Sequence, residues 1–293
     1  MTVDGGPGGE PAAQADDQVG RVRTFYERNT ERFRHLGQGG ASIHRAVWGP
    51  GVTSREAAFH HVEDRLLDLL PPGRVRVVDL GCGVGGSLLH LASRRADLTG
   101  DGVTISPAQA DVATRLVWQA GLTGRVRVRE GDFLAPPDDL AGADLAFSIE
   151  AFVHGPDPAG YFRAAAGLLR PGGRLVVVDD VLGPGGPTPS PREARLLDRF
   201  RTGWRVGSLL TVREAAAAAS SAGLRLVTDD DLTGSVELRR PRDRAVSVAV
   251  ALTHRLPARV RGDYWWSLAG GDALQRCLAT RLVEYRFLVF ERA

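Results

Sequence analysis

The chain has 293 residues, 43% of them hydrophobic and 25% charged, which suits one large globular domain with insertions rather than two full domains. A net charge of +2 without a basic block disfavours nucleic acid as a partner, and two separate cysteines, Cys82 and Cys277, disfavour a disulfide framework or a zinc site. Since neither an apolar signal core nor a stretch long enough to span a membrane is present, we expect a cytoplasmic protein.

The first quarter of the chain precedes any strand signal. Residues 1–17 are rich in Gly, Pro, Ala and acidic residues, a composition typical of a disordered leader. Helical spacing of apolar residues follows over 18–36 and again over 53–70, where a Thr-Ser pair can supply the N-cap. We interpret residues 18–72 as a helical cover over an active site. Helices that only pack on the edge of a sheet are the alternative.

The stretch V-R-V-V-D-L-G-C-G-V-G-G, residues 75–86, organises the rest of the chain. Its β-branched start predicts a buried parallel strand that ends at Asp79, and glycines follow at 81, 83 and 85. Glycine lets the backbone turn sharply and approach a ligand closely. A glycine turn between a strand and a helix N-terminus is typical of a site for a nucleotide-like ligand.

Strands and helices then alternate regularly, which predicts an α/β fold with a largely parallel sheet. Further strands are predicted over 96–105, 126–130, 144–148, 174–180 and 224–227, with a last strand over 282–290. Helices are predicted over 107–120, 161–169 and 211–222. We expect residues 73–293 to form the main domain, with a helical lid inserted at about 183–210.

Four motifs resemble one family of enzymes. D-L-G-C-G-V-G (79–85) resembles motif I of class I S-adenosylmethionine (SAM) methyltransferases, and its spacing departs from the dinucleotide fingerprint G-x-G-x-x-G. G-V-T-I-S-P-x-Q (102–109) is similar to a variant in cyclopropane fatty acid synthases, tocopherol methyltransferases and terpenoid C-methyltransferases. S-x-E followed by a histidine (148–154) resembles the last two groups, and F-Y-E-R-N-T with I-H-R-A-V-W resembles the N-terminal cover of geranyl diphosphate C-methyltransferases.

The resemblance implies a Rossmann-like class I methyltransferase sheet with an antiparallel last strand, an N-terminal helical cover and a helical insertion after the fifth strand. It implies SAM as the cofactor. The second strand lacks the acid that usually holds the ribose hydroxyls, so Thr104 and Gln109 are expected there instead. A structural role for Asp79, as a satisfied buried acid, is the alternative to a role in binding. The residues expected around the cofactor are Asp79, Gly81, Cys82, Gly83, Gly85, Thr104, Ile105, Gln109, Asp132, Phe133 and Ser148.

The methyl acceptor is expected beyond the fourth strand. Glu150 is the main catalytic candidate, with an ion pair to an N-terminal arginine as the alternative, and His154 can titrate near neutral pH or make only a lid or cap contact. Tyr26 is the third catalytic candidate. Aromatic rings can stabilise a cation, although rings in helices are more often part of the core. The residues expected to contact the substrate are Tyr26, Arg28, His44, Trp48, Phe152, Phe200, Trp204, Arg205 and Trp265.

The resemblance favours transfer of a methyl group to an alkene carbon of a prenyl or terpenoid substrate, either geranyl diphosphate or a prenylated natural product. The resulting carbocation would lose a proton to Glu150, before or after a cyclisation. A diphosphate would require arginines, with Arg45 among the candidates, and would suit Mg²⁺, although the sequence shows no metal-ligand motif. O- or N-methylation of a small secondary metabolite and SAM binding without catalysis are the alternatives. We expect a small-molecule partner and neither nucleic acid nor a membrane, and the sequence does not determine whether the chain forms a homo-oligomer.

Overall fold

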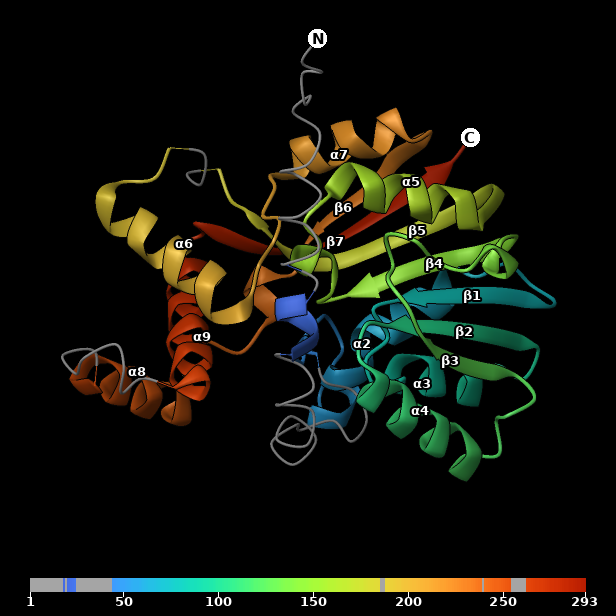
Figure 1. Cartoon of the computed structure of the whole chain (residues 1–293), viewed down its shortest axis with the longest axis horizontal. Coiled ribbons are helices and arrows are strands. Elements are labelled where there is room, and N and C mark those ends of the chain that lie inside the picture. The colour runs from blue at the N-terminus through green and yellow to red at the C-terminus, as the bar shows by residue number, and fades with distance from the viewer. Residues whose placement is uncertain (1–17, 19, 25–43, 185–187, 239, 254–261) are drawn as a thin grey trace, which may run out of the picture.

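A computed structural model describes residues 18, 20–24, 44–184, 188–238, 240–253 and 262–293. At its centre lies a seven-stranded sheet in the order β3-β2-β1-β4-β5-β7-β6, shown in Figure 1. The strands are β1 Val75–Leu80, β2 Leu98–Thr104, β3 Val126–Glu130, β4 Ala143–Ile149, β5 Leu169–Leu182, β6 Leu224–Asp231 and β7 Val283–Arg292. The first five are parallel, and β7 is antiparallel to β5 and β6.

Helices cover both faces of this sheet and one of its ends (Figure 1). The helices are α2 Arg55–Asp68, α3 Gly86–Arg94, α4 Pro107–Gln119, α5 Pro158–Leu168, α6 Pro191–Trp204, α7 Val212–Ser221, α8 Pro241–Thr253 and α9 Asp263–Ala279. One hydrophobic core lies between the sheet and α2, α3, α4 and α9, and a second lies between the sheet and α5 and α7. The expected Rossmann-like sheet, with its antiparallel last strand, is confirmed.

The local signals for the helices hold where the structure describes them. Ser54 caps α2 and Ser106 caps α4, each accepting from a main-chain N–H in the first turn. Helix α5 begins three residues before the predicted start at residue 161, because Asp157 caps it and Pro158 occupies its first position. The last strand lies inside the sheet, where its main-chain groups pair with β5 on one edge and β6 on the other, and most of its side chains are buried.

The segment expected as an inserted lid packs as part of a larger helical group. Helix α6 crosses α9 so closely that a Cβ on Gly203 would lie 2.4 Å from the carbonyl oxygen of Trp266. Helix α8 packs on α9 in turn, and α9 also contacts β7. These three helices lie beyond the carboxyl end of β4 (Figure 1), so segments far apart in the sequence form one wall at that edge. Most of the helix predicted over 18–36 falls outside the described residues.

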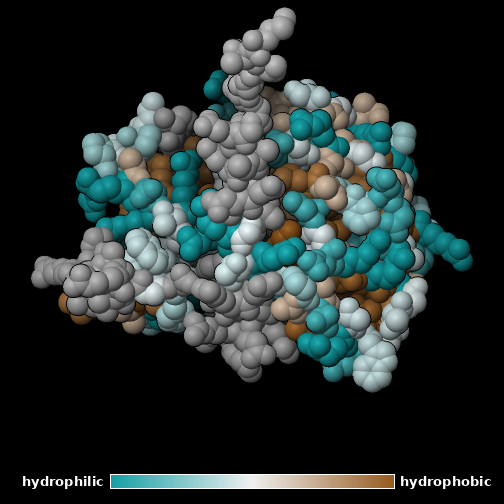
Figure 2. Space-filling view, viewed as in Figure 1, coloured by the Kyte–Doolittle hydropathy of each residue, from teal (hydrophilic) through white to brown (hydrophobic). Residues whose placement is uncertain are grey.

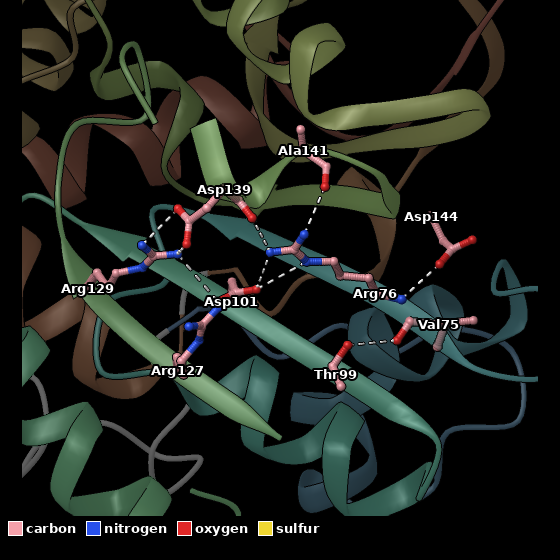
Figure 3. A network of polar contacts seen from close by, with 9 residues as sticks. All are labelled: Val75, Arg76, Thr99, Asp101, Arg127, Arg129, Asp139, Ala141 and Asp144. Atoms are coloured by element: carbon pink, nitrogen blue, oxygen red, sulfur yellow. Dashed lines mark hydrogen bonds and ion pairs between the residues drawn. The ribbon is translucent and has the colours of Figure 1, made fainter. Parts of the chain in front are cut away.

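A polar network occupies the face of β1, β2 and β3 that α5 and α7 leave uncovered (Figure 3). Asp101 is 4% exposed, and its carboxylate accepts from Arg76 at 3.0 Å and pairs with Arg127 at 3.0 Å. Arg129 binds Asp139 in the loop that follows β3. Figure 2 shows a mostly hydrophilic outer surface on the same view, with apolar residues in small groups. Ion pairs therefore stabilise this part of the sheet in place of a helix.

Candidate active site

A cavity of about 170 Å³ opens at the carboxyl edge of the sheet. Residues from the ends of β1, β2, β4 and β5 line it, together with residues from α6 and from the segment before α2. Ligands bind at this edge in open α/β sheets because loops from several strands converge there. The cavity brings together predicted residues from distant parts of the sequence: His44, Asp79, Gly81, Cys82, Gly83, Thr104, Ile105, Gln109, Phe133, Glu150, His154, Phe200 and Trp204.

The glycine turn after β1 forms one wall of the cavity. Gly81, Gly83 and Gly85 all have positive φ, which only glycine adopts at little cost. At Gly81 space is also limiting, because a Cβ would lie 2.4 Å from the Cβ of Ala151. The turn leads into α3, whose first residues, Gly86 and Ser87, also line the cavity. Backbone N–H groups at this helix N-terminus suit an anionic group of a ligand.

Asp79 is buried at the base of this turn. Burial, and secondarily the nearby Glu63, raise the pKa of Asp79 well above its usual 3.8. No cationic side chain among the described residues forms an ion pair with Asp79. A ligand with an ammonium group would supply an ion-pair partner for Asp79, and the methionine portion of SAM carries one.

A buried pair, His44 and Glu63, lies close to this acid. Nε2 of His44 lies 2.7 Å from Oε1 of Glu63, and Nδ1 lies 3.1 Å from the carbonyl oxygen of Arg45. Burial alone would lower the pKa of His44, but Glu63 outweighs burial and raises it to about 9. Because both ring nitrogens face acceptors, both donate, and His44 is an imidazolium at neutral pH.

Thr104 and Gln109 lie at the end of β2 and the start of α4. Both are buried cavity residues, and the Thr104 hydroxyl donates to Oε1 of Gln109 at 2.8 Å. This bond fixes the amide so that its NH₂ group remains available to donate. The nearest acid in β2, Asp101, lies three residues earlier in the arginine network, so it does not reach this edge.

Glu150 follows β4 and has φ = 52°, an uncommon conformation for a residue with a side chain. Its Oε1 accepts from the main-chain N–H of Arg45 and from the hydroxyl of Tyr285, each at 3.0 Å, and lies 3.2 Å from Nε of Arg45. The predicted alternative, an ion pair with an N-terminal arginine, is therefore present. It does not remove Glu150 from the cavity, because Glu150 lines it.

The Arg45 guanidinium is committed to protein carboxylates. It binds Asp180 with two hydrogen bonds, at 2.8 and 2.6 Å, in addition to Glu150. Burial raises the pKa of Asp180, and Arg45 offsets part of that effect. Burial and the adjacent Asp180 raise the pKa of Asp179 well above its usual value. The candidate role of Arg45 in holding a diphosphate conflicts with these bonds, because its donors already face Asp180 and Glu150.

His154 and two aromatic residues form the wall toward α6. His154 is 7% exposed, and burial lowers its pKa, so its ring is neutral at neutral pH. Phe200 and Trp204 come from α6, and Phe133, in the loop after β3, lines the same cavity. The cavity thus combines polar groups from the ends of β1, β2, β4 and β5 with the rings of Phe133, Phe200 and Trp204.

Several predicted residues do not line the cavity. Phe152 packs on Tyr161 and Phe162 in the core, because the short 3₁₀ helix after Glu150 turns its ring toward α5. Ser148 lies within β4, one residue before its end, and its hydroxyl shares a 2.7 Å hydrogen bond with the hydroxyl of Tyr161. Asp132 accepts from the main-chain N–H of Leu134.

The other predicted residues that do not line the cavity make structural contacts elsewhere. Gly85 caps α3, and Trp48 packs beside Ala58 and Phe59. Arg205 ends α6, where its carbonyl oxygen lies 3.3 Å from Nδ1 of His154. Trp265 donates to the hydroxyl of Thr253 between α9 and α8. Tyr26 and Arg28 lie outside the described residues.

The structure adds residues that the sequence analysis did not assign to this site: Glu63, Asp179, Asp180 and Tyr285. The adjacent acids at the end of a β-branched strand were a usable signal, because a buried strand end is an expensive place for two carboxylates. The sequence gives no signal for Tyr285, since an aromatic residue in a buried strand is ordinarily part of the core.

Fold and site together define a Rossmann-like α/β protein with a ligand site at the glycine turn. A family model described as a methyltransferase domain matches residues 77–173. The chain is 30% identical over 195 residues to 27-O-demethylrifamycin SV methyltransferase from Amycolatopsis mediterranei (strain S699), a match that covers 66% of this chain and 70% of that protein. The chain belongs to the class I SAM-dependent methyltransferases.

The names of other similar proteins specify different reactions. The chain is 32% identical over 222 residues to 24-methylenesterol C-methyltransferase 2 from Oryza sativa subsp. japonica, covering 75% of this chain but only 60% of that one. Among solved structures, the [4+2]-cyclase SpnF has a TM-score of 0.73 at 21% identity and covers 92% of this chain and 94% of its own. Geranyl diphosphate C-methyltransferase from Streptomyces coelicolor A3(2) has a TM-score of 0.67 at 19% identity. That match covers 94% of this chain and 98% of the other. At these identities the structures show the fold alone.

The site suits SAM on the observations above. A turn that excludes a Cβ at Gly81 fits a close approach of the ligand, and a buried acid that forms no ion pair with the described residues fits an ammonium group. Within the described ranges, no three His, Cys, Asp or Glu side chains are grouped so as to hold a metal ion. In the same residues, no helix is both long and apolar enough to cross a membrane.

Proposed function

We propose that this methyltransferase adds a methyl group to an alkene carbon of a prenyl or terpenoid substrate. The observation that carries the proposal is the carboxylate of Glu150, which lines the same cavity as the rings of Phe133, Phe200 and Trp204. An alkene needs no base before it attacks the methyl group, but it needs placement in a site without water. The similarity to a sterol C-methyltransferase supports the same chemistry.

In this reaction the alkene carbon forms a bond to the methyl carbon, and the bond from that carbon to the sulfonium sulfur breaks. The positive charge passes to the neighbouring alkene carbon, where aromatic faces stabilise it. Glu150 then removes a proton from a carbon next to the cation, and a new double bond forms. A helical cover formed by residues 18–72 and a lid at about 183–210 would exclude water. Asp79, Thr104 and Gln109 would hold the cofactor that supplies the methyl group.

Methylation of a hydroxyl group is the second candidate. The observation that favours it is His154, a buried cavity residue whose neutral imidazole can accept a proton from a hydroxyl. The 30% identity to an O-methyltransferase supports it as well. Here removal of the proton precedes or accompanies transfer, so turnover would depend on His154 rather than on Glu150.

Mass spectrometry of products separates the two candidates. The chain is incubated with SAM, with and without Mg²⁺, against geranyl diphosphate and a panel of prenylated and hydroxylated small molecules. Wild type is compared with the variants Glu150→Gln and His154→Gln. A prenyl product heavier by one methylene, lost with Glu150→Gln, supports C-methylation. Methylation of hydroxyl groups only, lost with His154→Gln and retained with Glu150→Gln, overturns it.

A further inference from the structure

The carboxylate of Glu150 is bound on one side only. Its Oε1 faces three donors: the main-chain N–H of Arg45, Nε of Arg45 and the hydroxyl of Tyr285. In the described part of the chain no group forms a hydrogen bond with Oε2. Since Glu150 lines the cavity with a side chain that is 17% exposed, Oε2 is the oxygen that a bound molecule would meet.

Both partners of Oε1 are themselves held in place. Arg45 is fixed by its two hydrogen bonds to Asp180, and its guanidinium carbon lies 4.4 Å from the centroid of the Tyr285 ring. Tyr285 is fully buried in β7, between β5 and β6. Burial and Glu150 raise the pKa of Tyr285 well above its usual value, so its hydroxyl keeps its proton and donates.

The main chain at Glu150 agrees with this arrangement. Its positive φ costs free energy and persists only where surrounding contacts enforce it. The N–H of Glu150 donates to Val178 of β5, and its side chain is tied to Arg45 and Tyr285. Contacts from β5 therefore fix the main chain of Glu150, and contacts from the segment before α2 and from β7 fix its side chain.

We propose that Arg45 and Tyr285 are positioning residues that bind Glu150 through Oε1 and present Oε2 to the methyl acceptor. The inference rests on the proposed function in taking Glu150 as a group that contacts the acceptor. It adds that the segment before α2 completes the active site, because Arg45 reaches Glu150 only when that segment lies against the sheet. Glu150 is productive only in this bound orientation.

A double-mutant cycle between Tyr285→Phe and Glu150→Gln tests this. Turnover is measured with whichever acceptor of the panel is methylated, at carbon or at oxygen. We expect Tyr285→Phe to lower kcat about 10-fold or more, with KM for the acceptor and Kd for SAM changed less than about twofold. In the Glu150→Gln background the same change should have no further effect. Tyr264→Phe, at a half-exposed tyrosine of α9, is the matched control and should leave kcat unchanged.

Arg45 is tested without leaving Asp180 unpaired, in the double variant Arg45→Gln with Asp180→Asn. We expect kcat to fall as for Tyr285→Phe. Arg45→Lys should retain part of the activity, because a positive charge remains near Glu150. The same cycle is run on urea unfolding, which needs no turnover. If Glu150→Gln is inactive with every acceptor, the unfolding cycle decides alone.

The outcomes separate the two proposals. Additive effects of Tyr285→Phe and Glu150→Gln on kcat, or on unfolding where kcat is not measurable, overturn the positioning role. A coupled cycle with an O-methylated product keeps that role and overturns C-methylation. An additive cycle with a C-methylated product keeps C-methylation and overturns the positioning role.

Discussion

Nε2 of His44 lies 2.7 Å from Oε1 of Glu63, and both side chains are buried beside the glycine turn. The hydroxyl of Ser87, in the first turn of α3, donates to the same oxygen at 3.2 Å. The pair thus connects the segment before α2, the helix α2 and the start of α3. It also places a positive charge close to Asp79, where that acid would otherwise face only Glu63.

We predict that this pair makes folding stability fall as the pH rises. The pKa of His44 is about 9 in the folded protein against 6.5 for an unperturbed histidine, so the folded state binds the extra proton. The stabilisation is fully present below pH 6.5 and is lost between pH 6.5 and 9, and it amounts to about 3 kcal/mol. Urea unfolding at several pH values, compared with His44→Gln, checks it. Parallel pH curves for the two proteins would contradict the prediction.

Asp79→Asn should separate stability from cofactor binding. Burial raises the pKa of Asp79, so stability from its neutral form is present below pH 3.8 and lost as the pH rises toward the folded value. Asparagine does not ionise, so the Asp79→Asn variant does not lose this stability as the pH rises. Without ligand it should be at least as stable as wild type at pH 7. It should bind SAM about 10-fold more weakly or worse, because it lacks the charge that meets an ammonium group. Calorimetric titration with SAM gives the affinity and urea unfolding the stability. Unchanged affinity would assign Asp79 a structural role.

Gly81→Ala should abolish SAM binding, since a Cβ there would lie 2.4 Å from Ala151 in addition to the cost of φ = 103°. Gly142→Ala is a matched control, because Gly142 also has a positive φ of 87° but open space around it. We expect Gly142→Ala to lose about 1 kcal/mol of stability and no affinity for SAM. Equal affinities of the two variants for SAM would show that the close contact at Gly81 is not limiting.

Asp101→Asn should destabilise the fold without affecting the cofactor. The carboxylate of Asp101 compensates Arg76 and Arg127, and both arginines are partly exposed, so we expect a loss of about 2 kcal/mol (Figure 3). SAM affinity should not change, because Asp101 lies three residues before Thr104 and on the arginine side of the sheet. A drop in SAM affinity at unchanged stability would mean that Asp101, not Thr104 and Gln109, serves the ribose. Urea unfolding and calorimetric titration distinguish the two results.

Much of the fold was predictable because its signals are local. The β-branched run before Asp79, the glycine turn and the capping serines each act within a few residues. The position of β7 inside the sheet was not a local property. It depends on which strands pair with its two edges, here β5 and β6, which come from other parts of the chain.

The candidate site divides in the same way. The sequence by itself determined the glycine turn, the Thr104–Gln109 pair and Glu150, since each follows a recognisable strand end and the carboxyl ends of parallel strands meet at one edge. Only the tertiary structure decided which side chains complete the site. Arg45 is 105 residues from Glu150, and Tyr285 is 135 residues from it on the other side. Hydrogen bonds across such separations form only when the whole sheet is assembled, because each partner is positioned by the packing of a different strand or segment rather than by its own sequence neighbours.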